Sequence, residues 1–148
     1  MDRIPEFISN HPLLFAAFVA TLAMIAFMEY QRATQAAKPL SPMRATRLQN
    51  SEDAVFIDVR ARKEYEAGHL PGAHSVPASE VDQHLKQLEK IKGVPWILYD
   101  DGGVHAQRVA KKLASAGFGP LHAVDGGLPA WTKAELPIST EKRKKKKT

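Results

Sequence analysis

The stretch Ala54-Val55-Phe56-Ile57-Asp58-Val59 is a nearly continuous apolar run. Runs of this kind are typical of a parallel strand that is buried on both faces of a sheet. A second such run covers residues 94–99, and a third covers residues 121–124. Segments with helical signals lie between them. This alternation predicts an α/β domain in which helices cover both faces of a mainly parallel sheet.

Five helices are expected around these strands. Ser41 followed by Pro42 predicts an N-cap and a first helical residue, which opens a helix through about residue 48. Ser79, with an acidic residue three positions later, predicts a capping box and a helix up to Gly93. A helix after the loop at residues 100–103 should end at Gly117. The remaining two are expected at residues 62–67 and 129–133.

An apolar run that begins at Leu13 and ends at Met28 is interrupted only by Thr21. Extended back to residue 7, it would form a helix of roughly 33 Å, against a hydrocarbon core of about 30 Å. A cleaved signal peptide and a buried helix of a soluble protein are the alternatives. The residues before the run lack a basic cluster, and the run is apolar on all sides, so residues 1–30 are predicted to be a permanent transmembrane anchor.

The basic residues that follow this run predict the orientation of the anchor. Arg32, Lys38, Arg44 and Arg47 come after it, whereas the residues before it carry little net charge. The positive-inside rule then places the rest of the chain in the cytoplasm. We expect a linker at residues 31–39, a folded domain at 40–138 and a basic tail at 139–148.

The net charge of +5, from 21 basic and 16 acidic residues, comes from the tail. Without its six charges, 15 basic residues face 16 acidic ones, so sequence-specific nucleic-acid binding by the domain is not expected. The tail itself is expected to be solvated or to be attracted to anionic lipid, with ribosomal RNA as the other partner of this charge. These six residues are Lys142, Arg143, Lys144, Lys145, Lys146 and Lys147.

The chain contains no cysteine. This excludes disulfides, zinc-thiolate and iron-sulfur ligation within the chain, and every mechanism that needs a thiolate of its own.

Several short motifs occur through the predicted domain: Asp58-Val59-Arg60, Glu64-Tyr65, Gly68-His69-Leu70-Pro71-Gly72-Ala73, Pro77, Gly117-Phe118, Gly126-Gly127 and Trp131. Together these motifs resemble the signature of the rhodanese-like domain family. The resemblance covers about residues 40–138 and implies a five-stranded, mainly parallel sheet with a functional loop after the strand at residues 94–99. With the apolar run in front, the chain resembles single-pass, membrane-anchored rhodanese-like proteins of bacteria, which implies the inner membrane.

The signature residues are expected to be structural. Asp58 and Arg60, at the end of a buried strand, should form charge-assisted hydrogen bonds to nearby backbone, and Glu64 should pair with Arg60 on the same short helix. His69 is expected to be a hydrogen-bonded structural histidine, and Trp131 a packed aromatic. The glycines and prolines are expected to shape turns; these are Gly68, Pro71, Gly72, Pro77, Gly126 and Gly127.

The loop after Tyr99 is the candidate functional site. In active members of the family this loop begins with a cysteine that accepts sulfur, and Asp100 occupies the matching position here. A carboxylate oxygen cannot form the persulfide that a thiolate forms. The remaining residues of the degenerate loop are Asp101, Gly102, Gly103, Val104 and His105, the last of them where related loops often carry arginine.

Three interpretations of Asp100 remain open at this stage. Its carboxylate could occupy the loop's own anion cradle, with Gly102 and Gly103 providing the backbone turns. It could instead form a solvated turn with Asp101, or bind a metal ion together with Asp101 and His105.

From these observations we expect a catalytically inactive domain that binds a protein partner at the membrane, without a cofactor or a metal ion. The first alternative is a membrane-anchored sulfurtransferase, which the missing cysteine disfavours. The second is a ribosome or RNA tether that acts through the basic tail.

Overall fold

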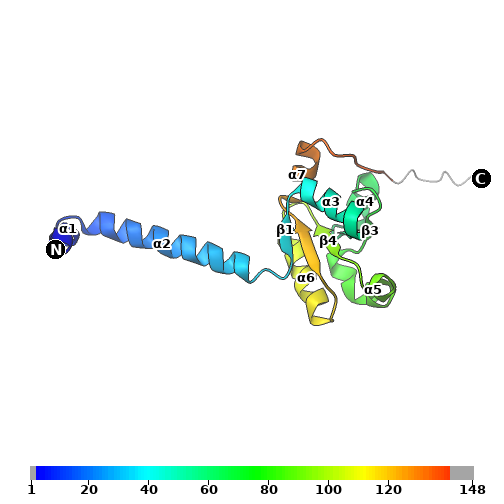
Figure 1. Ribbon diagram of the computed structural model, residues 1–148, viewed down its shortest axis with the longest axis horizontal. Helices are drawn as coiled ribbons and strands as arrows, with labels where there is room; N and C mark the ends of the chain where they lie inside the picture. Colours follow the sequence, from blue (N-terminus) through cyan, green and yellow to red (C-terminus); the bar gives the residue numbers. More distant parts are fainter. Residues whose placement is uncertain (1–2, 141–148) are drawn as a thin grey trace, which may run out of the picture. The chain divides into compact units, whose positions relative to one another are not determined.

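The computed structural model describes residues 3–140 and consists of two compact units, residues 1–35 and 36–148 (Figure 1). The first unit contains helices α1 (Arg3–Asn10) and α2 (Pro12–Ala33). The expectation of one continuous helix from residue 7 is wrong, because the helix is interrupted at His11, which has a non-helical backbone conformation before Pro12. Helix α2 instead gains its length at its other end, where it continues to Ala33.

Helix α2 is long and apolar enough to cross a membrane. Its 22 residues correspond to about 33 Å at 1.5 Å per residue, and its most apolar window has a mean hydropathy of 2.0. None of its residues is buried against protein. A core helix of a small domain would bury one face, so α2 does not have the burial of such a helix.

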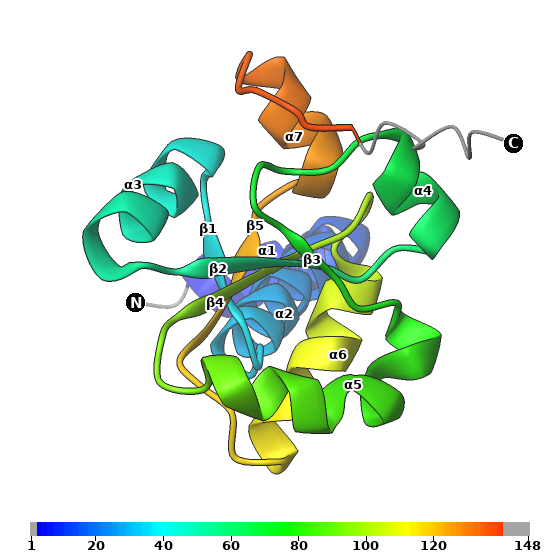
Figure 2. The same ribbon diagram turned by 90° about the vertical axis from the view of Figure 1, so that its right-hand side faces the viewer.

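The second unit is built on a sheet of five parallel strands (Figure 2). This confirms the predicted α/β fold class and the five-stranded sheet. In spatial order the strands are β1 (Lys38–Leu40), β5 (Leu121–Val124), β4 (Trp96–Tyr99), β2 (Val55–Asp58) and β3 (His74–Ser75).

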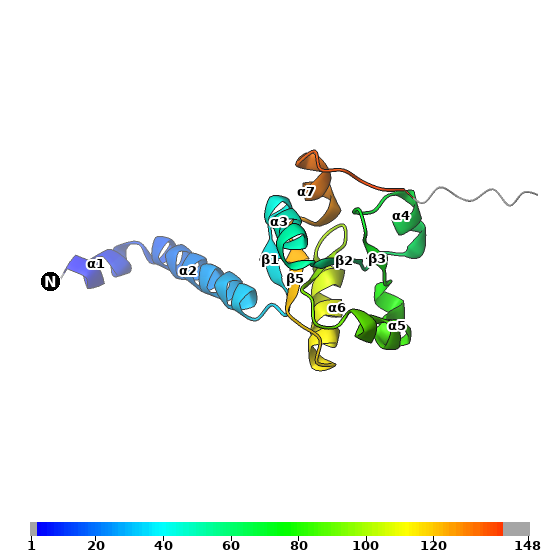
Figure 3. The same ribbon diagram turned by 45° about the vertical axis from the view of Figure 1, so that its right-hand side comes forward.

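Helices cover both faces of the sheet, as expected (Figure 3). Helices α5 (Val81–Leu88) and α6 (Val104–Ser115) lie on one face, and α3 (Pro42–Glu52), α4 (Arg62–Ala67) and α7 (Gly127–Lys133) lie on the other. Successive strand residues therefore enter different cores. Ile57 packs in the cluster that contains Val109, whereas Phe56 packs edge-on against Trp131, with ring centroids 5.3 Å apart.

Two predicted helix boundaries need correction. Ser41 does cap α3, because its hydroxyl accepts a hydrogen bond from the Arg44 N–H at 3.4 Å, but the helix continues to Glu52 and ends at Asp53, which has φ of 54°. The capping box at Ser79 is wrong. Residues 78–80 form a 3-10 turn, η1 (Ala78–Glu80), so Glu80 precedes α5 and no side chain caps that helix.

Strand β1 was not predicted, and its first two residues, Lys38 and Pro39, belong to the segment expected as a linker. It has three residues, with Pro39 in the middle and no apolar run. Proline is tolerated there because β1 is an edge strand that pairs only with β5. Gln107 of α6 fixes the residue just before this strand, since its side chain exchanges two hydrogen bonds with the backbone of Ala37.

Gly127 is the point where α7 contacts the end of β4. It has φ of 62°, and a Cβ atom built on it would lie 2.2 Å from the Asp100 carbonyl oxygen. The same carbonyl accepts a hydrogen bond from the Leu128 N–H at 2.9 Å. The start of α7 is thus closely packed on the backbone of the candidate loop.

We predict that Gly127→Ala destabilises the fold by about 2–5 kcal/mol, because overpacking and a left-handed alanine both raise the free energy of the native state. Urea unfolding of the full chain in detergent micelles measures this change. Gly102→Ala is the matched control, since a Cβ atom there meets nothing within 4 Å and the backbone is not left-handed. Equal stability of the two variants would contradict the prediction.

Candidate functional site

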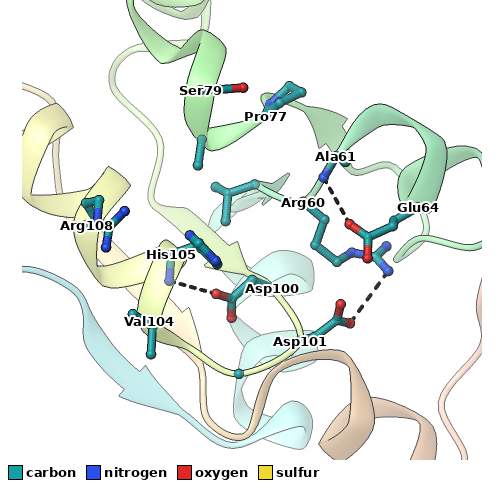
Figure 4. A pocket seen from close by; sticks show the side chains of 13 residues that line it. Arg60, Ala61, Glu64, Pro77, Ser79, Asp100, Asp101, Val104, His105 and Arg108 are labelled. Carbon is teal, nitrogen blue, oxygen red and sulfur yellow. Dashed lines mark hydrogen bonds and ion pairs between the residues drawn. The ribbon is translucent and has the colours of Figure 1, made fainter.

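The pairing of β2 with β4 brings the candidate residues to one edge of the sheet. Asp58 lies opposite Tyr99 in the parallel register, so the loops that follow both strands leave the same edge. A cavity of about 720 Å³ opens between these loops and the start of α6 (Figure 4). Its charged and polar lining includes Arg60, Glu64, Asp100, Asp101, His105 and Arg108.

The Asp100 carboxylate occupies the loop in the way that the cradle interpretation expects. Oδ1 accepts a hydrogen bond from the Gly103 N–H. Oδ2 accepts hydrogen bonds from the N–H groups of His105 at 2.8 Å and Ala106 at 3.3 Å. Asp100 is only 1% exposed. The carboxylate therefore satisfies the free N–H groups at the start of α6, where the helix dipole also favours a negative charge.

These hydrogen bonds decide between the three interpretations of Asp100. A solvated turn is wrong for a side chain that is almost fully buried. The same hydrogen bonds occupy both carboxylate oxygens of Asp100, and within residues 3–140 no three His, Asp or Glu side chains form a group that could hold a metal ion. Gly103, with φ of 85°, provides the turn into α6, whereas Gly102 has no left-handed backbone and is not required for the turn.

The rest of the loop faces outward. Asp101 has a side chain that is 56% exposed, and its Oδ1 lies 3.8 Å from the Nη1 of Arg60 across the cavity (Figure 4). Val104 is 66% exposed, and His105 is exposed beside it. The buried Asp100 carboxylate of the loop thus has hydrogen-bond partners for both oxygens, whereas the accessible outer surface of the loop combines charged, polar and apolar side chains.

A buried ion pair lies behind the loop. The Arg60 side chain donates to Asp58 through Nε at 3.0 Å and Nη2 at 2.7 Å, and Nη2 also donates to the Gly68 carbonyl at 2.6 Å. The Tyr99 hydroxyl donates to Asp58 Oδ2 at 2.8 Å and accepts from the Leu70 N–H at 3.1 Å. The expected bonds to nearby backbone are present, since Asp58 accepts from the Arg60 N–H at 2.9 Å and Arg60 donates to the Gly68 carbonyl. The direct pairing of the Asp58 and Arg60 side chains was not predicted. The network links β2 and β4 to the chain after α4.

Burial and the charge of Asp58 determine the protonation of this network. Burial raises the pKa of Tyr99 far above its ordinary value, and the negative charge of Asp58 raises it further. Burial alone would lower the pKa of Arg60, but its hydrogen bond to Asp58 and the charge of Asp58 raise the pKa above the ordinary value. Both groups keep their protons, so they act as fixed donors and do not transfer protons.

Other signature residues have structural roles that differ in part from those expected. Glu64 does not pair with Arg60. Its Oε2 accepts a hydrogen bond from the Ala61 N–H at 3.1 Å, because Arg60 precedes α4 and points to Asp58. Gly68 has an extended φ of 169° and forms no left-handed turn, whereas Gly72 does, with φ of 75°.

His69 and Trp131 are buried and hydrogen-bonded, as expected. The His69 ring stacks on Tyr65, and its Nδ1 lies 2.7 Å from the Tyr65 carbonyl. The backbone of His69 also exchanges two hydrogen bonds with Ser139. Trp131 donates to the Pro137 carbonyl at 2.9 Å. Pro71 accepts a weak bond from Gln49 at 3.5 Å, and Pro77 is buried at the cavity wall.

Sequence reasoning missed three members of the site. Tyr99 was predicted only as the end of a strand, although its hydroxyl completes the Asp58 network. Arg108 lines the cavity one helical turn after Val104, a spacing that could have indicated it, and Ser79 lines the opposite wall. The basic residues 142–147 lie outside the described residues.

Sequence comparison agrees with this geometry, since residues 41–134 match the rhodanese-like domain family. The chain belongs to the rhodanese-like domain family. It is 33% identical over 139 residues to the uncharacterized protein YibN of Escherichia coli K12, which covers 93% of this chain and 97% of YibN. It is also 31% identical to thiosulfate sulfurtransferase GlpE of Pseudoalteromonas translucida, over 66% of this chain and 90% of that protein.

Solved structures give the same answer for the fold. The rhodanese-like domain of the Anabaena protein Alr3790 superimposes with a TM-score of 0.62 at 26% identity, over 74% of this chain and 84% of that domain. A thiosulfate sulfurtransferase from Pseudomonas aeruginosa superimposes with a TM-score of 0.66 at 25% identity, over 79% of this chain but only 23% of that larger protein.

We predict that removing either partner of the buried ion pair is strongly destabilising. Asp58→Ala and Arg60→Ala should each cost about 3–5 kcal/mol, because each leaves one buried charge without its partner. The double variant should cost less than the sum of the two, with a coupling of about 0.5–3 kcal/mol. Denaturant unfolding of the four proteins measures the coupling.

The exposed pair Arg62 and Glu66, 3.3 Å apart on α4, is the matched control for this cycle. Its coupling should be about 0.5 kcal/mol or less, because both side chains are solvated. Full additivity of the changes at Asp58 and Arg60 would contradict the assigned network.

Proposed function

We propose that this protein is a membrane-tethered, catalytically inactive rhodanese-like domain that binds a protein partner at the cytoplasmic face of the bacterial inner membrane. The observation that carries the proposal is the Asp100 carboxylate inside the loop. It accepts hydrogen bonds from Gly103, His105 and Ala106, which are the N–H groups that an anionic ligand would use. An external anion would have to compete with a covalently attached carboxylate.

The outer surface of the same loop supports a binding role. Val104 presents an exposed apolar side chain, and Asp101, His105 and Arg108 surround it with charges of both signs and a polar ring. An apolar anchor with a polar rim is the usual composition of a protein-recognition surface. The cavity beside it has room for a side chain of the partner.

The membrane tether in this proposal is α2. Its length and mean hydropathy fit a bilayer core, and the basic residues after it favour a cytoplasmic domain. Two membrane signals would act together, because the basic residues 142–147 would add attraction to anionic lipid. The relative GlpE is named for thiosulfate sulfurtransferase activity, so a membrane-anchored sulfurtransferase is the alternative function.

We predict that the wild-type chain transfers no sulfur from thiosulfate to cyanide above the buffer rate, because it has no thiolate to carry the sulfur. Asp100→Cys is the matched variant. Its thiolate would attack the outer sulfur of thiosulfate, form a persulfide and release sulfite, so mass spectrometry should show a gain of one sulfur atom. Wild-type turnover comparable to that of an active sulfurtransferase would refute the inactive assignment.

We also predict that a photo-crosslinking amino acid at Val104 forms a discrete protein adduct in cells that express the full chain. The same amino acid at Lys90, an exposed position in η2 (Glu89–Ile91), is the control. Reversing the charge of Asp101 should reduce the Val104 adduct, because this residue borders the exposed valine. Identical adducts from Val104 and Lys90, or no adduct from Val104, would contradict the binding surface.

A further inference from the structure

A second, smaller cavity lies on the side of the sheet that carries α3, away from the candidate loop. Its volume is about 320 Å³, and it lies between α3 and the edge strands β1 and β5. No residue of the Asp100 loop contributes to it. Its lining residues are Leu40, Arg44, Arg47, Leu48, Ser51 and His122.

The charges around this cavity are mainly positive. Arg44 and Arg47 are exposed, and neither has an ion-pair partner within residues 3–140. Lys38 of β1 pairs with His122 of β5 in the parallel register. Burial lowers the pKa of His122, and the charge of Lys38 lowers it further. Glu52 is the acidic residue that acts on His122 in the opposite direction. Three cations against one carboxylate leave a net positive surface.

His122 has an unsatisfied polar atom in this region. Its Nδ1 is buried and has no hydrogen-bond partner in the described part of the chain. A buried polar atom without a partner is costly, and a ligand oxygen or a water molecule would relieve that cost. Two arginines without ion-pair partners in the described residues line the same cavity as this imidazole. Guanidinium groups bind phosphate oxygens through strong charge-assisted hydrogen bonds, so the cavity is suited to a phosphate group.

Met43 adds an apolar element to the same helix face. It is 56% exposed and precedes Arg47 by four residues, so both side chains lie on one side of α3. An exposed apolar residue among cations is typical of a helix that rests on a membrane surface. A site for a free phosphate ion would not need it.

The position of this face in the chain also favours a membrane. Only residues 34–37 connect the end of α2 to the start of β1. Four residues can span at most about 14 Å, so a bilayer that holds α2 keeps Lys38 within reach of its headgroups.

We propose that the face formed by Lys38, Met43, Arg44, Arg47 and His122 docks on the anionic lipid headgroups of the bilayer that holds α2. The two exposed arginines bind lipid phosphate, and Met43 enters the interfacial layer. This inference rests on the proposed anchoring by α2 but not on the binding surface at Val104. It gives the domain a fixed orientation on the bilayer.

The full chain in lipid nanodiscs tests this proposal. Because the chain has no cysteine, Ser51→Cys provides a unique site for a fluorescent label at the rim of the cavity. Quenching by a nitroxide on the lipid headgroup reports docking. We expect quenching in nanodiscs that contain phosphatidylglycerol and much less in phosphatidylcholine alone. A label at Gln83→Cys on α5 should be quenched weakly in both.

Charge reversal identifies the residues responsible. Arg44→Glu combined with Arg47→Glu should lower the docked population at least about five-fold, since each basic residue near an anionic surface contributes about 1 kcal/mol. Lys63→Glu combined with Lys90→Glu changes the net charge equally at exposed positions outside this face and should leave quenching unchanged.

Other outcomes would overturn the proposal. Equal quenching with and without phosphatidylglycerol excludes recognition of anionic headgroups, and loss of quenching when inorganic phosphate is added at constant ionic strength assigns the cavity to a free anion. Loss on deletion of residues 141–148, with no effect of the arginine changes, assigns docking to the tail. Crosslinking of Ser51 to a protein, with no lipid-dependent quenching, assigns the face to a protein partner.

Discussion

The parallel register of β2 and β4 determines where every polar group of the candidate site lies. It sets Asp58 opposite Tyr99, and it makes the loop after Tyr99 leave the same edge of the sheet as the loop after Asp58. The Arg60 guanidinium can then donate hydrogen bonds to Asp58, while the Asp100 carboxylate accepts hydrogen bonds from backbone N–H groups at the start of α6. One edge therefore holds two carboxylates, each neutralised by a different device: a buried cation for Asp58 and backbone N–H groups for Asp100.

Most of the folded unit was predictable from sequence because its buried strands are short apolar runs. Strand β5 and helix α4 have the predicted boundaries, and β2 and β4 lie inside theirs. Strand β1 could not be predicted in this way, because Lys38 and Pro39 are exposed and the strand is defined by its pairing with β5. The predicted capping box at Ser79 failed for a similar reason. Local spacing favoured it, but residues 78–80 form a 3-10 turn, so the N-cap position of α5 is Glu80 and Ser79 lies one residue before it.

The candidate site was predictable at the level of its loop but not of its partners. The absence of cysteine and the position of Asp100 were visible in the sequence, and the free N–H groups of any helix start indicated where a carboxylate would go. The hydrogen bonds of Tyr99 to Asp58 and Leu70 join residues 41 and 29 positions apart, so no local pattern indicates them. The same holds for Glu64, whose carboxylate follows the geometry of its own helix start and not the nearby charge of Arg60.

Replacing a thiol by a carboxylate changes which part of the domain is sensitive to oxidants. A carboxylate is already at the end of its oxidation series, so peroxide leaves the Asp100 loop unchanged. From residue 36 onward the chain has one sulfur atom, the thioether of Met43, and it lies exposed on α3. Conversion of that thioether to a sulfoxide makes the side chain polar. Oxidative stress would therefore act on helix α3 of this protein while the Asp100 loop stays intact.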